Sequence, residues 1–493
     1  MTIHEFLTDF QGVFFWRQTA VILGLFIYGF LCRIVLRRNN PVIRDIFLAF
    51  PFGISMYCLS GFLLLITGIP FRVDTICCLM LLFFVIMLLL GTKRPYGFQT
   101  MPWYFTLSVV IGVFVLACFC TSGLLSVSVS NDSLYYYSMY GKALVHYGMY
   151  RPQFDVFLTD VGQGAAIIGA LPHLFGFNET FGIQHFFNLS FLGYFGYALF
   201  NETRQAGNRR AFIFTALSIL TLLVSMPYVI VSKWVMANVY FMETLFMTVY
   251  LAYELVRDER EREILFDLSV FITVLSLLRM EGTIMVLMIL LCMSLLDFTN
   301  KELFVQGLLP MSVLGIAYDI YIFLIIKVSA PYTFLTKGKA LIQIAGMCAV
   351  GIYFVWMRNK RFKFISEHLK LWLISGLVLV NGALFARNPG VFIGNMKAFL
   401  GNLFGQSGWG IFPVFMLALL VLTFEWPVKL HYFDVLSLGY LLVTLAVCFA
   451  REGVLREGVG DSGNRVLLQI VPLLLFTVAM HVKEYCLKKS VPS

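Results

Sequence analysis

This sequence predicts an all-α protein, a polytopic transmembrane helix bundle of about 13–15 spans with a helical outer loop. Hydrophobic residues make up 60% of the 493 positions, charged residues only 13%, and the mean hydropathy is +0.85. A soluble domain averages about 25% charged residues, which its surface needs. Apolar runs of roughly 20 residues, long enough to cross about 30 Å of hydrocarbon, recur along the chain. The basic residues stand in short clusters between these runs, as in the loops of membrane proteins.

The apolar runs predict the individual spans, with boundaries uncertain by several residues. We expect spans at approximately 13–36, 45–68, 72–91, 102–125, 179–200, 211–231, 235–255, 264–279, 282–297, 305–326, 340–357, 371–386, 409–424, 432–450 and 466–483. Arg279 and Glu281 stand between two short runs, which form either a half-membrane pair or one kinked unit. The N-terminus lacks the basic stretch of a cleavable signal, so the first run is expected to be a retained membrane helix.

The distribution of Lys and Arg predicts the orientation, because cytoplasmic loops are rich in them. The longest loop, 126–178, has only Lys142 and Arg151, so we expect it on the outer side. More than half of the 36 basic residues lie in the shorter loops of the other side, around 37–44, 92–100, 201–210, 256–263, 298–304, 358–370 and 425–431, and in the tail. Topology therefore explains the net charge of +9, and nucleic acid is not an expected partner.

No cofactor-binding motif is visible. The 10 cysteines lie in or beside apolar runs or in the basic tail, so there is no disulfide framework or metal knuckle. The sequence has no phosphate loop, no GxSxG, no HExxH and no dinucleotide fingerprint. No cofactor is therefore assigned, and a divalent metal stays open.

The outer loop 126–178 carries the first candidate site. Its segment 130–132 offers N-caps for a helix from about 133 to 146, which Gly148 would end. Asp132 would be held at the outer interface, beside aromatic rings that suit a sugar. The alternative is an N-cap carboxylate without a catalytic role, in an ordinary interfacial tyrosine belt. One face of the helix, expected along the membrane surface, carries Tyr136, Tyr140 and Leu144.

Other acidic residues and one short helix extend this site. The loop contains Asp155 and Asp160, and then an apolar stretch, 165–175, which is too short to span the membrane. We expect that stretch to be a second surface helix or a re-entrant helix. Glu243, just inside a span, needs a partner. Either Arg279 pairs with it, or it belongs to the outer cavity.

The last outer loop, 451–465, is the second candidate site. Its glycines let the backbone approach a ligand, and Arg465 heads the final apolar helix, where it could clamp a phosphate at the headgroup level. The alternative is that Arg465 binds bulk lipid phosphate. Asp461 is a further candidate for the substrate cavity. Cations in other outer loops could widen a basic rim: Lys337, Lys339, Arg387 and Lys397.

Three places resemble the GT-C superfamily of membrane glycosyltransferases, which includes lipid-linked-sugar-dependent protein mannosyltransferases and lipid A aminoarabinose transferases. They are Asp132 with Leu134-Tyr135-Tyr136 and a helix ending at Tyr147-Gly148; Leu174-Phe175-Gly176 with Asn178-Glu179; and Gly460-Asp461-Ser462-Gly463-Asn464-Arg465 before a Pro-containing helix. The resemblance implies a catalytic module at 102–483. Accessory transmembrane helices at 1–101 would precede it, and a cytoplasmic tail at 484–493 would follow it.

The resemblance implies an inverting glycosyltransferase of the bacterial plasma membrane, with its active site on the outer face. The donor would be a sugar on a polyprenyl phosphate, and the acceptor an envelope glycan, a lipid or a protein. Asp132 would be the general base, and Arg465, with Lys337 and Arg387, would stabilise the departing lipid phosphate. Asp132 and Arg465 are expected to face one outer cavity.

Three other classes stay open. An envelope polysaccharide polymerase or ligase would depend more on outer arginines. A lipid-linked-oligosaccharide flippase or secondary transporter would need charged residues along a midplane pathway. The spans look sparing in charge, with Glu243, Asp319 and Asp434 as the main cases, which disfavours transport. A structural membrane scaffold is the third class.

Overall fold

The computed structural model confirms an all-α, multi-pass integral membrane protein. It describes residues 13–36, 42–90, 137–149, 162–176, 181–232, 234, 236–257, 262–294, 303–326, 336–356, 368–405, 409–410, 412–423, 431–450, 455–458 and 461–490. Within these ranges the secondary structure is helical, without strands. Of the helices described, 7 are long and apolar enough to cross a membrane, or up to 8 if the bent pair Ser462–Leu468 and Val471–Leu487 is one span.

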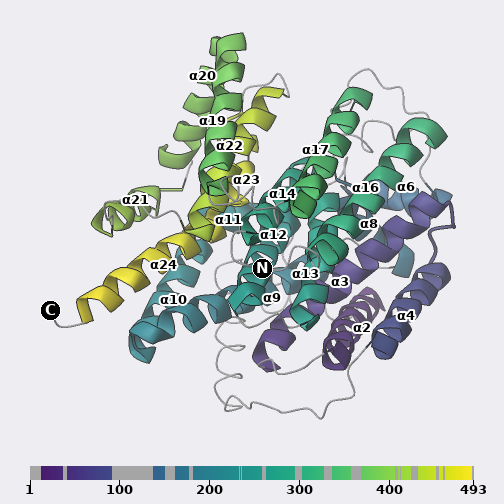
Figure 1. Ribbon diagram of the computed structural model, residues 1–493. Helices are drawn as coiled ribbons and strands as arrows, with labels where there is room; N and C mark the ends of the chain where they lie inside the picture. Colours follow the sequence, from purple (N-terminus) through teal and green to yellow (C-terminus); the bar gives the residue numbers. More distant parts are fainter. Residues whose placement is uncertain are drawn as a thin grey trace. The chain divides into compact units, whose positions relative to one another are not determined.

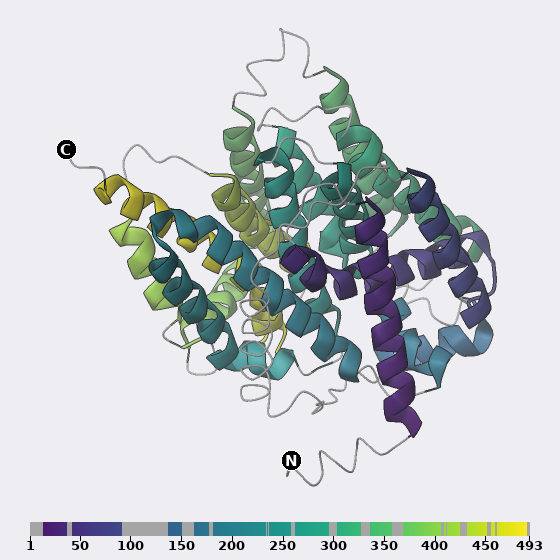
Figure 2. The same ribbon diagram turned by 90° about the horizontal axis from the view of Figure 1, so that it is seen from below.

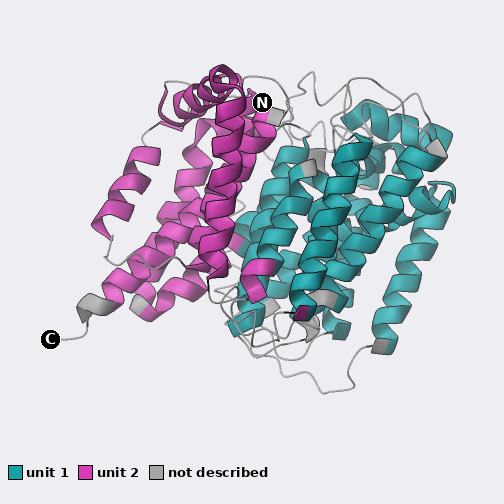
Figure 3. Ribbon diagram, turned by 45° about the horizontal axis from the view of Figure 1, so that its top comes forward, with its two compact units in different colours: residues 1–194, 232–290, 297–355 teal, residues 195–231, 291–296, 356–493 magenta. Residues whose placement is uncertain are grey.

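The chain divides into two compact units, drawn in two colours in Figure 3. Unit 1 comprises residues Met1–Tyr194, Ser232–Leu290 and Asp297–Val355. Its helices are α2 (Val13–Leu36), α3 (Val42–Thr67), α4 (Val73–Leu90), α6 (Met139–Tyr147), α8 (Gln163–Phe175), α12 (Ala237–Arg257), α13 (Arg262–Leu278), α16 (Leu309–Ile320) and almost all of α17 (Lys337–Trp356), with π-helical turns η4 (Leu303–Leu308) and η5 (Tyr321–Ile326). Two helices begin in unit 1 and end in unit 2: α9 (Phe181–Thr203) and α14 (Met280–Ser294).

Unit 2 comprises residues Phe195–Val231, Leu291–Leu296 and Trp356–Ser493. Its helices are the short η3 (Arg204–Ala206), α10 (Asn208–Val224), α11 (Met226–Val231), α19 (Leu369–Arg387), α20 (Pro389–Phe404), α21 (Phe412–Leu422), α22 (Tyr432–Ala450), α23 (Ser462–Leu468) and α24 (Val471–Ser490).

Helices α2, α3 and α4 lie side by side in unit 1 (Figures 1 and 2). The first two cross at glycines, because a Cβ on Gly29 would lie 1.9 Å from the Ala49 carbonyl oxygen. A Cβ on Gly53 would likewise lie 2.1 Å from the Leu25 carbonyl oxygen. Such close backbone contact through small residues is typical of helix packing in membranes, where no hydrophobic effect drives helices together.

Helix α12 forms the centre of unit 1, and aromatic rings line its contact with α9. Phe187 lies edge-on against Tyr240, with ring centroids 5.3 Å apart. Tyr194 packs against Tyr250 in the same way, at 5.8 Å. Edge-to-face packing of this kind stabilises a pair by about 0.5–1.5 kcal/mol beyond burial.

Most described helices lie where the apolar runs predicted them, but fewer of them qualify as full spans, and α20 was not predicted. The expected span 102–125 lies outside the described residues. The predicted break at Arg279 is confirmed, because α13 ends at Leu278 and α14 begins at Met280. The apolar helices below the length of a span are Val73–Leu89, Gln163–Phe175, Ile264–Leu278, Glu281–Ser294 and Phe412–Leu422.

Candidate functional site

The first predicted motif lies only partly within the described ranges. The helix expected at about 133–146 is described as α6, from Met139 to Tyr147. Gly148 ends it in the left-handed conformation, with φ 70°, and donates its N–H to the Leu144 carbonyl at 2.9 Å. The predicted glycine stop is confirmed. Outside the described residues lie Asp132, Tyr136, Asp155 and Asp160.

The face of α6 that carries Tyr140 and Leu144 points into unit 1. Leu144 is fully buried and Tyr140 is half-buried, so the prediction of a face along the membrane surface is wrong. The reason is that α6 packs closely on α8. A Cβ on Gly141 would lie 2.4 Å from the backbone carbonyl carbon of Gly169. The exposed residues of α6 are Met139, Lys142, His146 and Tyr147.

One hydrogen bond locates the end of α6 along the length of α3. The N–H of Phe71, in the turn between α3 and α4, donates to the Gly148 carbonyl at 2.7 Å. That turn follows Thr67, the last residue of α3, whereas Arg44 lies in the first turn of the same helix. The end of α6 and Arg44 therefore lie at opposite ends of α3, which is a candidate membrane span.

Helix α8 corresponds to the second predicted motif. Residues Gln163–Pro172 are all buried, so the surface alternative is wrong and the re-entrant alternative remains. The Tyr57 hydroxyl on α3 donates to the Ile167 carbonyl at 2.9 Å. Gly176 then ends the helix in the left-handed conformation, at φ 68°. With 13 residues, α8 is too short to cross the bilayer.

Of the predicted site residues that the structure describes, Glu243 is the most deeply buried. Its exposure is 0%, and neither carboxylate oxygen has a hydrogen-bond partner among the described residues. Arg279, the candidate partner, bonds elsewhere: its Nε donates to Glu281 Oε1 at 2.5 Å and its Nη1 to Asn238 Oδ1 at 3.0 Å. These bonds join the start of α12 to the α13–α14 junction and leave Glu243 unpaired within the described ranges.

A second buried acid lies on α16. Gln163, at the start of α8, donates from Nε2 to the Tyr318 hydroxyl at 2.5 Å. The neighbouring Asp319 is buried, and its Oδ2 has no hydrogen-bond partner among the described residues. Unit 1 thus contains two carboxyl groups within membrane helices that are not neutralised by an ion pair in the described part of the chain.

The late loop, here residues 455–465 of which 459–460 are not described, is fixed on α20. Asn395 Oδ1 accepts the Leu455 N–H at 2.9 Å. Asn402, two turns later on the same buried face, accepts the Gly458 N–H at 3.1 Å and donates to the Arg456 carbonyl at 3.0 Å. Each buried amide thus replaces the hydrogen bonds that the loop backbone would otherwise make with water.

Two residues of the late loop complete this clamp. Asn464 Nδ2 donates to the Gly458 carbonyl at 2.6 Å, and Ser462 Oγ accepts the Arg456 N–H at 3.0 Å. The backbone N–H groups of Leu455, Arg456 and Gly458 are therefore all used within the protein. These three N–H groups therefore do not bind a phosphate in this conformation.

The clamped loop presents four charged side chains. Arg456 and Glu457 are exposed, and Asp461 and Arg465 are half-buried. Arg465 lies on α23, which is bent by 43° against α24, so it precedes the last helix rather than heading it. Arg456 was not among the predicted site residues, because sequence alone does not show which loop side chains are held in place.

The sequence reading also missed α20, which it treated as an outer loop. The signal was present, because Asn388-Pro389 is a typical helix start and Asn388 Oδ1 accepts the Val391 N–H at 3.3 Å. Arg387, exposed at the end of α19, belongs to unit 2 with Arg465. Lys337, exposed at the start of α17, belongs to unit 1.

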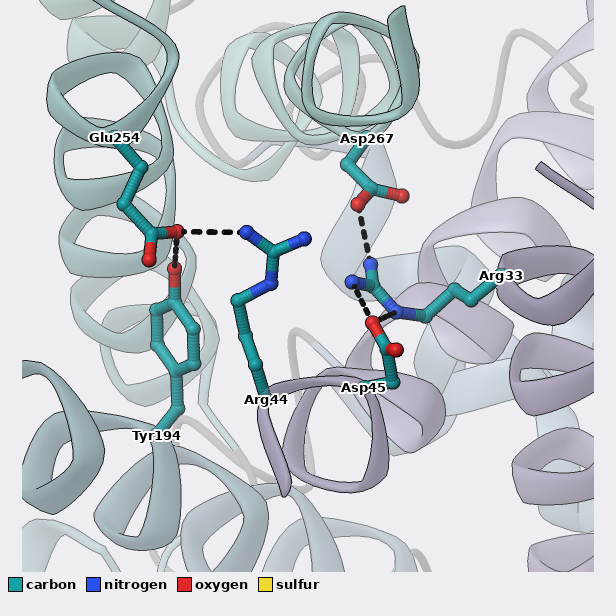
Figure 4. Close-up of polar contacts among 6 residues, drawn as sticks. All are labelled: Arg33, Arg44, Asp45, Tyr194, Glu254 and Asp267. Carbon is teal, nitrogen blue, oxygen red and sulfur yellow. Dashed lines mark hydrogen bonds and ion pairs between the residues drawn. The ribbon is translucent and has the colours of Figure 1, made fainter. Parts of the chain in front are cut away.

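A buried ion-pair network joins five elements of unit 1 (Figure 4). We use this name for Arg33, Arg44, Asp45, Tyr194, Glu254 and Asp267. Arg33 of α2 is its centre: Nη2 binds Asp45 Oδ1 at 2.7 Å, and Nη1 binds Asp267 Oδ2 at 2.5 Å. Each of these three side chains is almost completely buried.

The second part of the network involves the neighbouring residue of α3. Arg44 Nη1 binds Glu254 Oε2 at 3.3 Å, and the Tyr194 hydroxyl donates to the same oxygen at 3.4 Å. Figure 4 shows Arg44 reaching Glu254 of α12, while Asp45 turns to Arg33. The network lies at the end of α2, the start of α3, the end of α12 and the start of α13, the end expected to face the cytoplasm.

This network corrects the expectation that the spans are sparing in charge. Five charged residues of unit 1 helices are buried there, beyond Glu243 and Asp319. Hydropathy averages conceal them, because each lies within a few turns of a helix end in an otherwise apolar run. One sequence feature could have indicated these buried charges: Arg33 and Asp45 are opposite charges on either side of one short loop.

Unit 2 contains two histidine–carboxylate contacts that join α22 and α24. His481 Nε2 lies 2.8 Å from Asp434 Oδ1, and His431 Nε2 lies 3.3 Å from Glu484 Oε2. Within the described ranges, no group of three or more His, Cys, Asp and Glu side chains is arranged to hold a metal ion.

Comparison with known proteins gives no relative. No family model matches the sequence, and neither the curated proteins nor the solved structures contain a match.

Proposed function

We propose that the protein is a membrane glycosyltransferase that moves a sugar from a polyprenyl phosphate to an envelope glycan, lipid or protein on the outer face of a bacterial plasma membrane. One observation carries this proposal. The late loop is held by buried asparagines so that Arg456 and Arg465 are offered from a fixed backbone. Guanidinium groups suit a phosphate, because their donors match its oxygens.

The proposed chemistry is a single displacement with inversion. Asp132 takes the proton from an acceptor hydroxyl as that oxygen attacks the anomeric carbon of the sugar. The bond between this carbon and the phosphate oxygen breaks, and the lipid phosphate leaves with the bonding electrons. Arg465 stabilises the charge that develops on the leaving group, and Arg456, Lys337 and Arg387 are further candidates for this role.

The direct test is transfer by the purified protein in lipid nanodiscs. Defined polyprenyl-phosphate sugars and candidate acceptors are supplied, and glycosylated product is sought by mass spectrometry. We expect Asp132→Asn to abolish transfer but to retain donor binding, since a base acts only in the chemical step. We expect Arg465→Met to reduce both sugar transfer and donor binding. A fully active Asp132→Asn protein would remove Asp132 as the base.

The matched control is Arg72→Met, which removes an exposed arginine that pairs with its exposed neighbour Asp74 at 3.2 Å. This variant should transfer sugar at the wild-type rate. A loss equal to that of Arg465→Met would mean that the arginine effects reflect general charge rather than phosphate recognition.

The ion-pair network favours a second candidate, a lipid-linked-oligosaccharide flippase or secondary transporter. Buried charges in membrane helices often belong to transport pathways, although they also join helices. Transport of a labelled polyprenyl-linked sugar into sealed vesicles, without covalent product, would support this candidate. Vesicles that yield glycosylated acceptor but show no net movement of the lipid would support the transferase.

A further inference from the structure

Glu243 and Glu254 share one face of α12 but have very different surroundings. They lie eleven residues, or three helical turns, apart, so both point to the same side of the helix. Glu254 accepts hydrogen bonds from Arg44 and Tyr194. Glu243 has no hydrogen-bond or ion-pair partner in the described part of the chain, and its exposure is 0%.

Of the residues one turn away from Glu243 on α12, all but the buried Tyr240 are apolar. One turn before it is Val239, one turn after it are Phe246 and Met247, and all three are buried. The helix itself is a candidate membrane span that is 89% buried inside the protein. In this conformation the side chain of Glu243 has no surface exposed to solvent.

An ionised carboxylate cannot be stable in such a place without a cation. Removing a bare carboxylate from water costs several kcal/mol or more, and the group avoids the cost by binding a proton. Glu254, on the same helix, is paired with the Arg44 guanidinium of α3, whereas Glu243 has no such cation within the described ranges. Burial therefore favours the neutral carboxylic acid at Glu243.

We propose that Glu243 is a proton-binding site inside the membrane, which carries its proton at neutral pH. The proton is bound in the outer half of α12, close in sequence to Asn238, where Arg279 and Glu281 close the end of the helix. The site does not depend on the proposed sugar transfer and would exist equally in a transporter. The proposed proton site requires that the Glu243 carboxyl group is neutral while the Glu254 carboxylate is charged.

Infrared difference spectroscopy of the protein in nanodiscs tests this directly. Subtracting the spectrum of Glu243→Gln from that of the wild type should reveal one carboxylic acid C=O band that shifts in deuterium oxide. The matched difference spectrum, wild type minus Glu254→Gln, should show a carboxylate band and no carboxylic acid band. Loss of a carboxylate band in Glu243→Gln, without loss of an acid band, would overturn the proposal.

A second measurement uses the wild-type protein, so it does not depend on the folding of a variant. Hydrophobic carbodiimides add to protonated carboxyl groups in membranes, and the stable adduct is located by peptide mass spectrometry. We expect the adduct on Glu243 at neutral pH and none on Glu254. Adducts on Glu254 or Asp267 with none on Glu243 would contradict a neutral Glu243.

Discussion

Arg33 shows how much the stability of this protein depends on single buried charges. Its guanidinium binds Asp45 on the next helix and Asp267 on a distant one. Both carboxylates are almost completely buried, and each forms an ion pair with this guanidinium (Figure 4). Removing the cation leaves buried negative charge, which costs more than the ion pair itself contributes.

The first prediction follows at this scale. We expect Arg33→Met to lower the free energy of unfolding by about 3–5 kcal/mol, the usual cost of breaking a buried pair. Arg72→Met should change it by less than about 1 kcal/mol, because its pair with Asp74 is exposed, at 68% and 61%. Thermal unfolding in one detergent measures both. Equal destabilisation by the two substitutions would mean that burial does not decide the effect.

The single residues also show what sequence can predict. Gly148 was predicted as a helix stop because left-handed backbone strongly favours glycine, a local property. Which residues pair with Arg33, and that no described residue pairs with Glu243, depends on which helices meet. That information is not local. The sequence therefore placed Glu243 correctly in a span, but it suggested Arg279 as a partner, and Arg279 instead binds Glu281 and Asn238.

At the scale of elements, α20 and the late loop act together. We expect Asn402→Leu to free the backbone of residues 455–458, since Asn402 binds both Arg456 and Gly458. Stability should fall by roughly 1–3 kcal/mol, the cost of unsatisfied buried groups. Hydrogen exchange of the late loop should rise. Asn381→Leu is the control, because Asn381 binds Leu442 on α22, so the late loop should keep its protection.

The contact of α6 with α8 gives a third prediction. We expect Gly141→Ala to destabilise the protein by about 1–3 kcal/mol, because its Cβ would lie within the backbone of α8. Gly376→Ala on α19 is the control, since a Cβ there meets no heavy atom within 4 Å and alanine favours the helix. Thermal unfolding of both variants is the measurement. A neutral Gly141→Ala would mean that the two helices are less closely packed than described.

The sequence predicted the positions of most helices well, but it predicted less well which of them span the membrane. Hydrophobic runs locate helices, because a membrane helix must be apolar along its length. They do not fix the length of a helix: a span was expected at 409–424, but α21 (Phe412–Leu422) is too short for one. Helix α20 was missed because its buried face carries two asparagines, Asn395 and Asn402, among its apolar residues.

At the scale of the whole molecule, the orientation is the property that decides the proposed function. We expect a cysteine at Met149 to react with an impermeant maleimide in intact cells, in a background whose native cysteines are replaced. Met149 is exposed just after α6. A cysteine at Arg209, exposed at the start of α10, should react only after the membrane is opened. The reverse pattern would place the loop 126–178 in the cytoplasm, where an outer-leaflet donor does not reach it.

The residues of the ion-pair network are translated at different times, so its contacts form in a fixed order during biosynthesis. Arg33 and Asp45 are 12 residues apart, so they leave the ribosome almost together and can enter the bilayer as one neutralised hairpin. Asp267 is 234 residues from Arg33, which at about 5–20 residues per second means a delay on the order of 10–50 s. During that interval Arg33 can pair with Asp45 but not with Asp267, which has not yet been translated.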